Sequence, residues 1–301
     1  MTKQLTLAVG LMCALGLPPL SAAEWKPAEG PLMTKWAKDV SPYKVLPDYP
    51  RPQMVRKNWQ SLNGVWQLAF GKADEEPPTG KTLPEQILVP FPVESALSGV
   101  MKHGDRLWYR RTFTFPKEWF GQRILLHFGA VDWEATVYVN GTKLGTHRGG
   151  YDSFSFDITD ALERGKEQEV IVGVWDPTDA GTQPRGKQVN KPEGIFYTPT
   201  TGIWQTVWLE AVPKANIESV RIVPDVDNSK VLVTVLGRGA TEGMAVRAVA
   251  KEGERILSSG TGTVGKPFSI PIASPKLWTP DSPFLYDLRI ELRQTDKVLD
   301  S

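Results

Sequence analysis

From Trp59 onward, apolar and polar side chains alternate along the chain with a period of two residues. This period predicts β-strands, because successive side chains of a strand point to opposite faces of its sheet. At 139–142, Val-Asn-Gly-Thr predicts a hairpin, since Asn-Gly suits the positive φ angles of a type I′ turn. Helical apolar spacing never continues for three turns, and we expect only a single helical turn at 160–164. The alternating segments are 65–70, 107–115, 124–128, 135–139, 154–158, 170–174 and 205–211.

After Pro213 the predicted strands become shorter and richer in valine. Their spacing predicts a second, smaller β-sandwich, although an immunoglobulin-type unit needs about 100 residues and only 214–301 remain. We therefore expect the chain to stop at, or just before, the last strand of this sandwich. The expected strands are 217–223, 231–236, 244–250, 268–272 and 284–292, with turn clusters at 225–228 and 258–265.

The residues before the first strand predict a leader and an extended segment. Lys3, the apolar run 5–20 and Ser-Ala-Ala at 21–23 are the three parts of a secretory signal. The run of about 16 residues is short for a bilayer span of roughly 20, so an anchor helix is the less favoured alternative. We expect cleavage after residue 23 and export to the periplasm, or alternatively secretion, with no membrane association afterwards. The six prolines of 24–58 predict an extended lead-in packed on a domain surface.

Composition excludes several classes of partner. Lys and Arg number 35 against 34 Asp and Glu, and a net charge of +1 offers no electrostatic case for binding nucleic acid or an anionic membrane. The only cysteine, Cys13, lies in the predicted leader, so the exported protein depends on its cores rather than on disulfides. The 11 Trp, 11 Phe and 7 Tyr fit either large cores or flat recognition surfaces.

Motifs that would bind a cofactor or a metal are not convincing in this sequence. The segment 260–265 matches G-x-G-x-x-G, but a strand pattern follows it instead of the helix that a phosphate site needs, so we interpret it as a Gly-rich turn. The three histidines are too dispersed for a zinc site, and there is neither a G-x-S-x-G motif nor a thiol nucleophile. We expect no cofactor and no metal. Several acids could form a catalytic pair, but sequence alone cannot show one.

The segment from Trp175 to Trp208 has the most unusual composition. About 30 residues join two predicted strands here, and connections of this length often carry function. Its aromatic faces could stack on sugar rings while Asp, Arg, Lys and Gln side chains hydrogen-bond hydroxyl groups. The alternative is an ordered interdomain loop that packs its aromatic side chains against a neighbouring domain.

Six short stretches of the sequence, given at the end of this paragraph, occur in the same order as in family 2 glycoside hydrolases. They resemble the N-terminal part of this family, the group of β-galactosidases, β-glucuronidases and β-mannosidases. The resemblance covers roughly 50–301 and implies a jelly-roll, galactose-binding-like sandwich followed by an immunoglobulin-like sandwich. Its expected boundaries are 1–23 for the signal, 24–213 for the jelly roll and 214–301 for the second sandwich. The strings lie at 59–66 (WQSLNGVW), 108–113 (WYRRTF), 128–132 (FGAVD), 137–141 (VYVNG), 149–151 (GGY) and 202–209 (GIWQTVWL).

In this family a third domain, a TIM barrel, carries both catalytic glutamates. The string 277–286 resembles the end of the family's second domain, and the sequence stops at Ser301, where the barrel is expected to begin. A barrel of about 250 residues with eight helices cannot lie within these strand patterns. The resemblance therefore implies that no catalytic residue lies in these 301 residues.

The resemblance also implies that loops of the first domain reach the sugar in the innermost subsite. Asp176 is the first choice for a substrate contact, although an Asp before Pro177 could instead form an Asx-type turn. The expected function is the non-catalytic front of an exported hydrolase of terminal β-glycosides. The rival interpretations are a stand-alone carbohydrate-binding module and a structural or interaction sandwich without a ligand. Weaker contact candidates from the same loops are Arg185, Lys187, Gln188 and Trp204.

Overall fold

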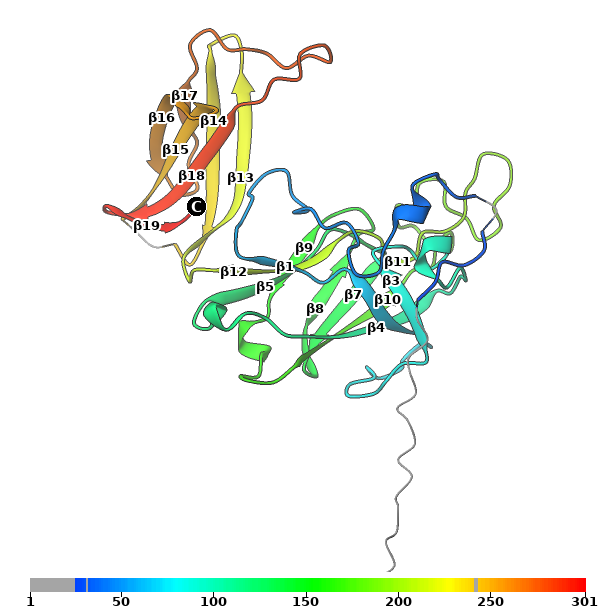
Figure 1. Ribbon diagram of the computed structural model, residues 1–301. Helices are drawn as coiled ribbons and strands as arrows, with labels where there is room; N and C mark the ends of the chain where they lie inside the picture. The colour runs from blue at the N-terminus through cyan, green and yellow to red at the C-terminus, as the bar shows by residue number, and fades with distance from the viewer. Residues whose placement is uncertain (1–24, 31, 241–242) are drawn as a thin grey trace, which may run out of the picture.

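The computed structural model describes residues 25–30, 32–240 and 243–301, and it consists almost entirely of antiparallel strands (Figure 1). The predicted signal segment, 1–23, lies outside the described residues. Nowhere in the described chain is there a helix with the length and apolar character needed to cross a bilayer. The expected helical turn near 160 is present but shorter than predicted. The helical turns are η1 (Ala37–Asp39), η2 (Ala96–Ser98), η3 (Lys117–Trp119) and η4 (Thr159–Ala161).

The first sandwich packs a six-stranded sheet against a four-stranded sheet. The six-stranded sheet has the order β3 (Glu85–Val89), β2 (Gly64–Phe70), β4 (Arg106–Phe113), β10 (Gln168–Trp175), β7 (Glu134–Val139), β8 (Thr142–Arg148). The four-stranded sheet has the order β1 (Trp59–Ser61), β12 (Val207–Val212), β5 (Arg123–Phe128), β9 (Phe154–Asp157). A separate pair, β6 (Val131–Asp132) and β11 (Gly202–Ile203), closes one end. The predicted hairpin is confirmed: Val139 pairs with Thr142, and Asn140 and Gly141 have φ of 47° and 78°.

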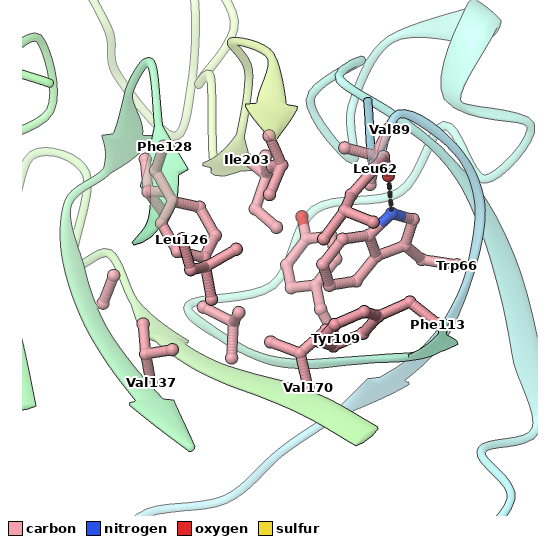
Figure 2. Packing of buried hydrophobic residues seen from close by; sticks show 14 of the residues in the cluster. Leu62, Trp66, Val89, Tyr109, Phe113, Leu126, Phe128, Val137, Val170 and Ile203 are labelled. Atoms are coloured by element: carbon pink, nitrogen blue, oxygen red, sulfur yellow. Dashed lines mark hydrogen bonds between the residues drawn. The ribbon is translucent and has the colours of Figure 1, made fainter. Parts of the chain in front are cut away.

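Alternate residues of the two sheets form one continuous core (Figure 2). Trp66, Tyr109 and Phe128 are its largest fully buried side chains. The polar Nε1–H of Trp66 has a hydrogen-bond partner in this core, because it donates to the Leu62 carbonyl at 2.8 Å, the dashed line in Figure 2. Burying each large apolar side chain contributes about 1.5–3 kcal/mol, so this core dominates the stability of the first sandwich.

The second sandwich has its own, smaller core. Its three-stranded sheet has the order β13 (Asn216–Asp225), β14 (Lys230–Arg238), β17 (Phe268–Pro271). Its four-stranded sheet has the order β16 (Arg255–Thr263), β15 (Met244–Glu252), β18 (Asp287–Gln294), β19 (Lys297–Asp300). Buried valines of β14 and β15 meet between the two sheets.

The predicted Gly-rich turn at 258–265 is wrong, because most of it lies in β16. Gly260 and Gly262 belong to this strand because the Phe268 ring lies against their backbone. A Cβ on Gly262 would come within 2.3 Å of the ring. The glycines therefore allow β17 to pack closely on β16. The turn was predicted wrongly because composition alone does not distinguish a turn glycine from a packing glycine.

The lead-in connects the two sandwiches. The described residues of this segment, 25–30 and 32–58, contain no strand and only the helical turn η1. Near the end of this segment Arg56 donates to both Asp300 oxygens, at 2.6 and 2.9 Å, and to the Ile217 carbonyl at 2.8 Å. Arg56 also lies 3.3 Å from Glu210 of β12. One buried guanidinium thus joins the lead-in to both sandwiches.

The outer face of β12 is covered, which the alternation did not predict. All six residues of this strand are buried, including Trp208 and Glu210, whose side chains point away from the core. Glu210 accepts from Tyr49 Oη at 2.5 Å, from Trp208 Nε1 at 2.8 Å, and from Arg51. The lead-in therefore replaces solvent on this face of the sheet.

Candidate functional site

A long connection, 176–201, joins β10 to β11 at one end of the first sandwich (Figure 1). It folds back on itself through two backbone hydrogen bonds. Val189 donates to the Tyr197 carbonyl at 3.0 Å, and Tyr197 donates to the Lys187 carbonyl at 2.9 Å. The connection is thus an ordered loop, in which backbone contacts fix the direction of the side chains.

Asp176 begins this loop and is only 2% exposed. Its Oδ1 accepts from the Thr178 N–H at 2.8 Å, which is the Asx-type turn left open by the sequence. Its Oδ2 accepts from Thr201 Oγ1, also at 2.8 Å, so it ties the start of the loop to its end. Burial raises the pKa of Asp176, and these hydrogen bonds oppose that rise. Both carboxylate oxygens of Asp176 are therefore engaged within the protein.

Two of the weaker contact candidates lie toward the surface of the loop. Arg185 is half-buried and donates from Nη1 to the Asp179 carbonyl at 2.9 Å. Lys187 is exposed, and its Nζ lies 5.9 Å from the centre of the Tyr197 ring. The Lys187 ammonium is the more accessible of the two charges.

The other two candidates are linked to residues outside the loop. Gln188 donates from Nε2 to Asp132 Oδ2 at 3.0 Å and accepts from the Thr200 N–H at 2.5 Å. Trp204 donates from Nε1 to the Gly150 carbonyl at 2.7 Å. The structure thus brings Gln188 and Trp204 to the same part of the surface, around Asp132 and Gly150.

Asp132 is the residue that sequence reasoning did not single out. It is 4% exposed at the end of β6, where it pairs with Gly202 of β11. Burial raises the pKa of Asp132 from 3.8 to about 6; the Gln188 hydrogen bond lowers it, and the charges of Asp176 and Glu94 raise it. The sequence offered Asp132 only as one of several acids that could form a catalytic pair and through its place in the family string at 128–132.

Glu94 is the third buried carboxylate near the loop, and sequence reasoning did not name it. Its Oε2 accepts from the Thr201 N–H at 2.9 Å, and its Oε1 lies 2.8 Å from His103 Nδ1. Burial raises the pKa of Glu94, while the contacts with His103 and Thr201 lower it. Thr201 therefore joins Glu94 to Asp176, through its N–H and its hydroxyl.

Glycine is required beside Asp132. A Cβ on Gly150 would lie 2.4 Å from Asp132 Oδ1, which accounts for the Gly-Gly-Tyr string at 149–151. The adjoining Tyr151 ring is 53% exposed and packs edge-on against Trp204, with 6.1 Å between ring centres. Exposed aromatic rings thus lie beside a buried carboxylate at this end of the sandwich.

The arrangement can recognise hydroxyl groups next to an apolar surface. Aromatic rings accept the C–H face of a sugar, and carboxylate and amide groups accept or donate hydrogen bonds to its hydroxyls. Asp132, whose pKa is raised to about 6, can accept a hydrogen bond from a hydroxyl when ionised and donate one when protonated. Among the described residues, no group of three or more His, Cys, Asp or Glu side chains is arranged to hold a metal ion.

Two adjoining family models match the chain. The sugar-binding domain of glycosyl hydrolases family 2 matches residues 79–213, and the model described as glycosyl hydrolases family 2 matches residues 214–301. Curated relatives agree with this assignment. A β-galactosidase of Thermoanaerobacter pseudethanolicus is 30% identical over 207 residues, which are 64% of this chain and 27% of the relative. A β-glucuronidase of Paenibacillus borealis is 26% identical over 268 residues, 81% of this chain and 44% of the relative.

Solved structures share the fold. A β-glucuronidase from Ruminococcus gnavus in complex with D-glucuronic acid has a TM-score of 0.67 at 23% identity, covering 84% of this chain and 45% of that chain. A β-glucuronidase from Lactobacillus rhamnosus has a TM-score of 0.67 at 24% identity, covering 84% and 44%. The chain spans less than half the length of these curated relatives and structures. It belongs to glycosyl hydrolase family 2, of which it carries the sugar-binding domain and the immunoglobulin-like domain.

Proposed function

We propose that this chain is the non-catalytic N-terminal portion of an exported glycoside hydrolase that acts on terminal β-glycosides. The observation that carries the proposal is the end of the sugar-binding domain, where Asp132 lies beneath Gln188 and the Tyr151 ring is exposed. The family match supports hydrolysis as the reaction of the whole protein. The β-galactosidase and β-glucuronidase relatives support a terminal β-linked sugar as its substrate.

The role of the described residues is to bind the sugar. Glycoside hydrolysis needs two carboxyl groups on opposite sides of the scissile bond, both reachable by the substrate. Asp176 and Glu94 are instead engaged by Thr201, and Asp132 by Gln188. We therefore propose that the acid/base and the nucleophile are supplied by a catalytic barrel and that these 301 residues alone are inactive.

The proposed contacts divide into direct and supporting residues. Gln188 and Trp204 lie around Asp132 and Gly150, and Lys187 is exposed on the loop, and we assign all three to the sugar directly. Asp176 remains a proposed contact by resemblance, in a position where it also holds the loop closed through Thr201. Arg185 completes the set by fixing the loop at Asp179.

Activity assays and gene sequence test the proposal together. The purified chain should release no nitrophenol from β-galactoside, β-glucuronide or β-mannoside reporters. Turnover that is lost in Asp132→Asn or Asp176→Asn would overturn the proposed division of labour. DNA that continues past codon 301 into alternating strand and helix patterns supports the enzyme. A stop codon followed by an unrelated gene supports the stand-alone carbohydrate-binding module.

Export is a separate part of the proposal and has its own test. Residues 1–30 fused to a reporter enzyme that is active only outside the cytoplasm should give periplasmic activity. Replacing the apolar Leu11 and Leu15 by arginine should abolish it, because a signal needs an uninterrupted apolar core. Activity from the fusion only in the culture medium would favour secretion instead.

A further inference from the structure

A second exposed tyrosine lies beyond the proposed sugar contacts. The Tyr197 side chain, on the 176–201 loop, is 66% exposed, and the neighbouring Ile195 and Phe196 are exposed as well. Single exposed apolar side chains are ordinary, but contiguous exposed ones rimmed by polar groups mark a binding surface. The surface around Tyr197 therefore calls for a ligand or a partner.

The backbone holds Tyr197 next to Gln188, with which it forms a parallel β-bridge. The Tyr197 N–H donates to the Lys187 carbonyl at 2.9 Å, and the Tyr197 carbonyl accepts from the Val189 N–H at 3.0 Å. The Gln188 side chain reaches Asp132, to which its Nε2 donates at 3.0 Å. The segment that contacts Asp132 is thus paired directly with Tyr197.

Tyr151 adjoins the same segment at Gly186. A Cβ on Gly186 would lie 3.4 Å from Tyr151 Oη. The Tyr151 ring in turn packs edge-on against Trp204, with 6.1 Å between ring centres. Both tyrosines therefore adjoin residues 186–188, and Trp204 lies next to Tyr151.

Hydrogen bonds to Asp179 keep this part of the loop in shape. The Asp179 carboxylate accepts from Asn190 Nδ2 at 2.7 Å and from the Asn190 N–H at 3.1 Å. The Asp179 carbonyl accepts from Arg185 Nη1 at 2.9 Å. These partners lie on either side of 186–188 in the sequence, so the segment is held at both ends. A loop that is already ordered loses little conformational entropy when it binds a ligand.

The chemistry around the Tyr197 ring favours a hydroxylated ligand. The Lys187 side chain is exposed, and its ammonium lies over the ring, 5.9 Å from the ring centre. An aromatic face accepts the C–H face of a sugar, while an ammonium donates to its hydroxyl groups. Protein–protein interfaces are depleted of lysine, so a lysine over the ring favours a sugar rather than a second protein surface.

We propose that the loop site continues past the terminal sugar and that Tyr197 binds the second unit of a β-linked oligosaccharide. The C–H face of this second unit lies on the Tyr197 ring, and the Lys187 ammonium donates to one of its hydroxyls. This inference rests on the proposed function, because it takes Gln188 and Trp204 as contacts of the terminal unit. Tyr197 then determines specificity, since it favours oligosaccharides over glycosides with a small leaving group.

NMR titration of the purified chain with matched ligands tests the second unit. The ligands are the methyl β-glycosides of D-galactose, D-glucose, D-mannose and D-glucuronic acid, and β-1,4-linked disaccharides with the same terminal units. The Trp204 indole N–H signal reports the terminal unit, and the Tyr197 ring signals report the second. For at least one sugar, the disaccharide should bind about tenfold more tightly than the methyl glycoside, because stacking and burial on an aromatic ring add to its affinity.

Two variants and a control separate the units. Tyr197→Ala should reduce the affinity for the disaccharide to that for the methyl glycoside and leave the methyl glycoside affinity unchanged. Tyr197→Phe keeps the ring and should keep most of the difference between the two ligands. Phe120→Ala removes another exposed ring, just before β5 and at the opposite end of that strand from Asp132, and should change neither affinity. Backbone amide spectra verify that each variant is folded.

Three outcomes would overturn the proposal. Equal affinities for each disaccharide and its methyl glycoside would leave the terminal sugar site intact and would assign the Tyr197 ring to a neighbouring domain. A parallel loss of both affinities in Tyr197→Ala would mean that the ring only shapes the loop. Absence of saturable shifts with every ligand, well above millimolar concentration, would overturn the proposed sugar site and the second unit with it.

Discussion

Replacing Gly202 by alanine tests how closely the end of the first sandwich is packed. Gly202 has φ of +92°, and a Cβ added there would lie 2.0 Å from Tyr109 Oη and 2.9 Å from Cζ. Tyr109 is fully buried, so its ring has no free space into which it can move. The substitution must therefore displace β11 together with the neighbouring Thr201, which holds Asp176 and Glu94.

Gly121 is a matched control for the backbone effect. Its φ is +91°, but no atom lies within 4 Å of the added Cβ. Forcing an L-residue into positive φ costs about 1–2 kcal/mol, and overpacking a core costs about 1–3 kcal/mol. Gly121→Ala carries only the first cost, whereas Gly202→Ala carries both. We expect Gly121→Ala to lower the free energy of unfolding by about 1–2 kcal/mol and Gly202→Ala to lower it by about 2–5 kcal/mol.

Urea denaturation followed by far-ultraviolet circular dichroism measures both losses. The loss of unfolded-state entropy on replacing glycine is common to the two variants and cancels in the comparison. Comparable m-values would show that the same cooperative unit unfolds in each variant. Equal losses for Gly202→Ala and Gly121→Ala would refute the steric reasoning and would mean that Tyr109 can be displaced at no cost.

The remaining predictions concern buried charges. Arg56→Met leaves Asp300 buried without its partner and should cost about 3–5 kcal/mol in urea denaturation. Arg148→Ala, which breaks a surface pair, should cost less than about 1 kcal/mol, and equal losses would contradict the burial argument. The raised pKa of Asp132 means that the folded chain keeps a proton that the unfolded chain releases. Stability should therefore fall by up to about 3 kcal/mol as pH rises from 3.8 through about 6, relative to Asp132→Asn measured in parallel. The pKa of Glu210 is lowered to about 2, so its stabilisation is complete above pH 4.5 and disappears as pH falls toward 2; thermal unfolding of Glu210→Gln should lack this loss.

Local patterns in the sequence predicted the strands and the family. Trp66, Leu68 and Tyr109 are buried as their alternation requires, because the period of two is set by the backbone of a single strand. The Asn140-Gly141 turn follows equally from local φ preferences. Local reasoning failed for β16, where Gly260 and Gly262 indicate a turn by composition but serve the packing of Phe268.

The candidate site was predicted only in part, because local patterns in the sequence do not encode contacts between distant segments. Gln188 and Trp204 were identifiable because they lie in the polar and aromatic segment from Trp175 to Trp208. Asp132 and Glu94 lie 56 and 107 residues from the partners that define them, Gln188 and Thr201. No local pattern encodes such a contact, since it depends on the pairing of β6 with β11 and on the loop folding back.

The sequence by itself determined the all-β class, the hairpin and the family, since each depends on residues close together in the chain. Only the tertiary structure decided where charge is buried. Arg56 meets Asp300 across 244 residues, and Glu210 meets Tyr49 across 161. A cleft lies above His127 because the lead-in and the second sandwich cover the outer face of β5 and β12. Burial and the pKa of a side chain depend on everything packed around it, and that environment forms only when distant segments meet.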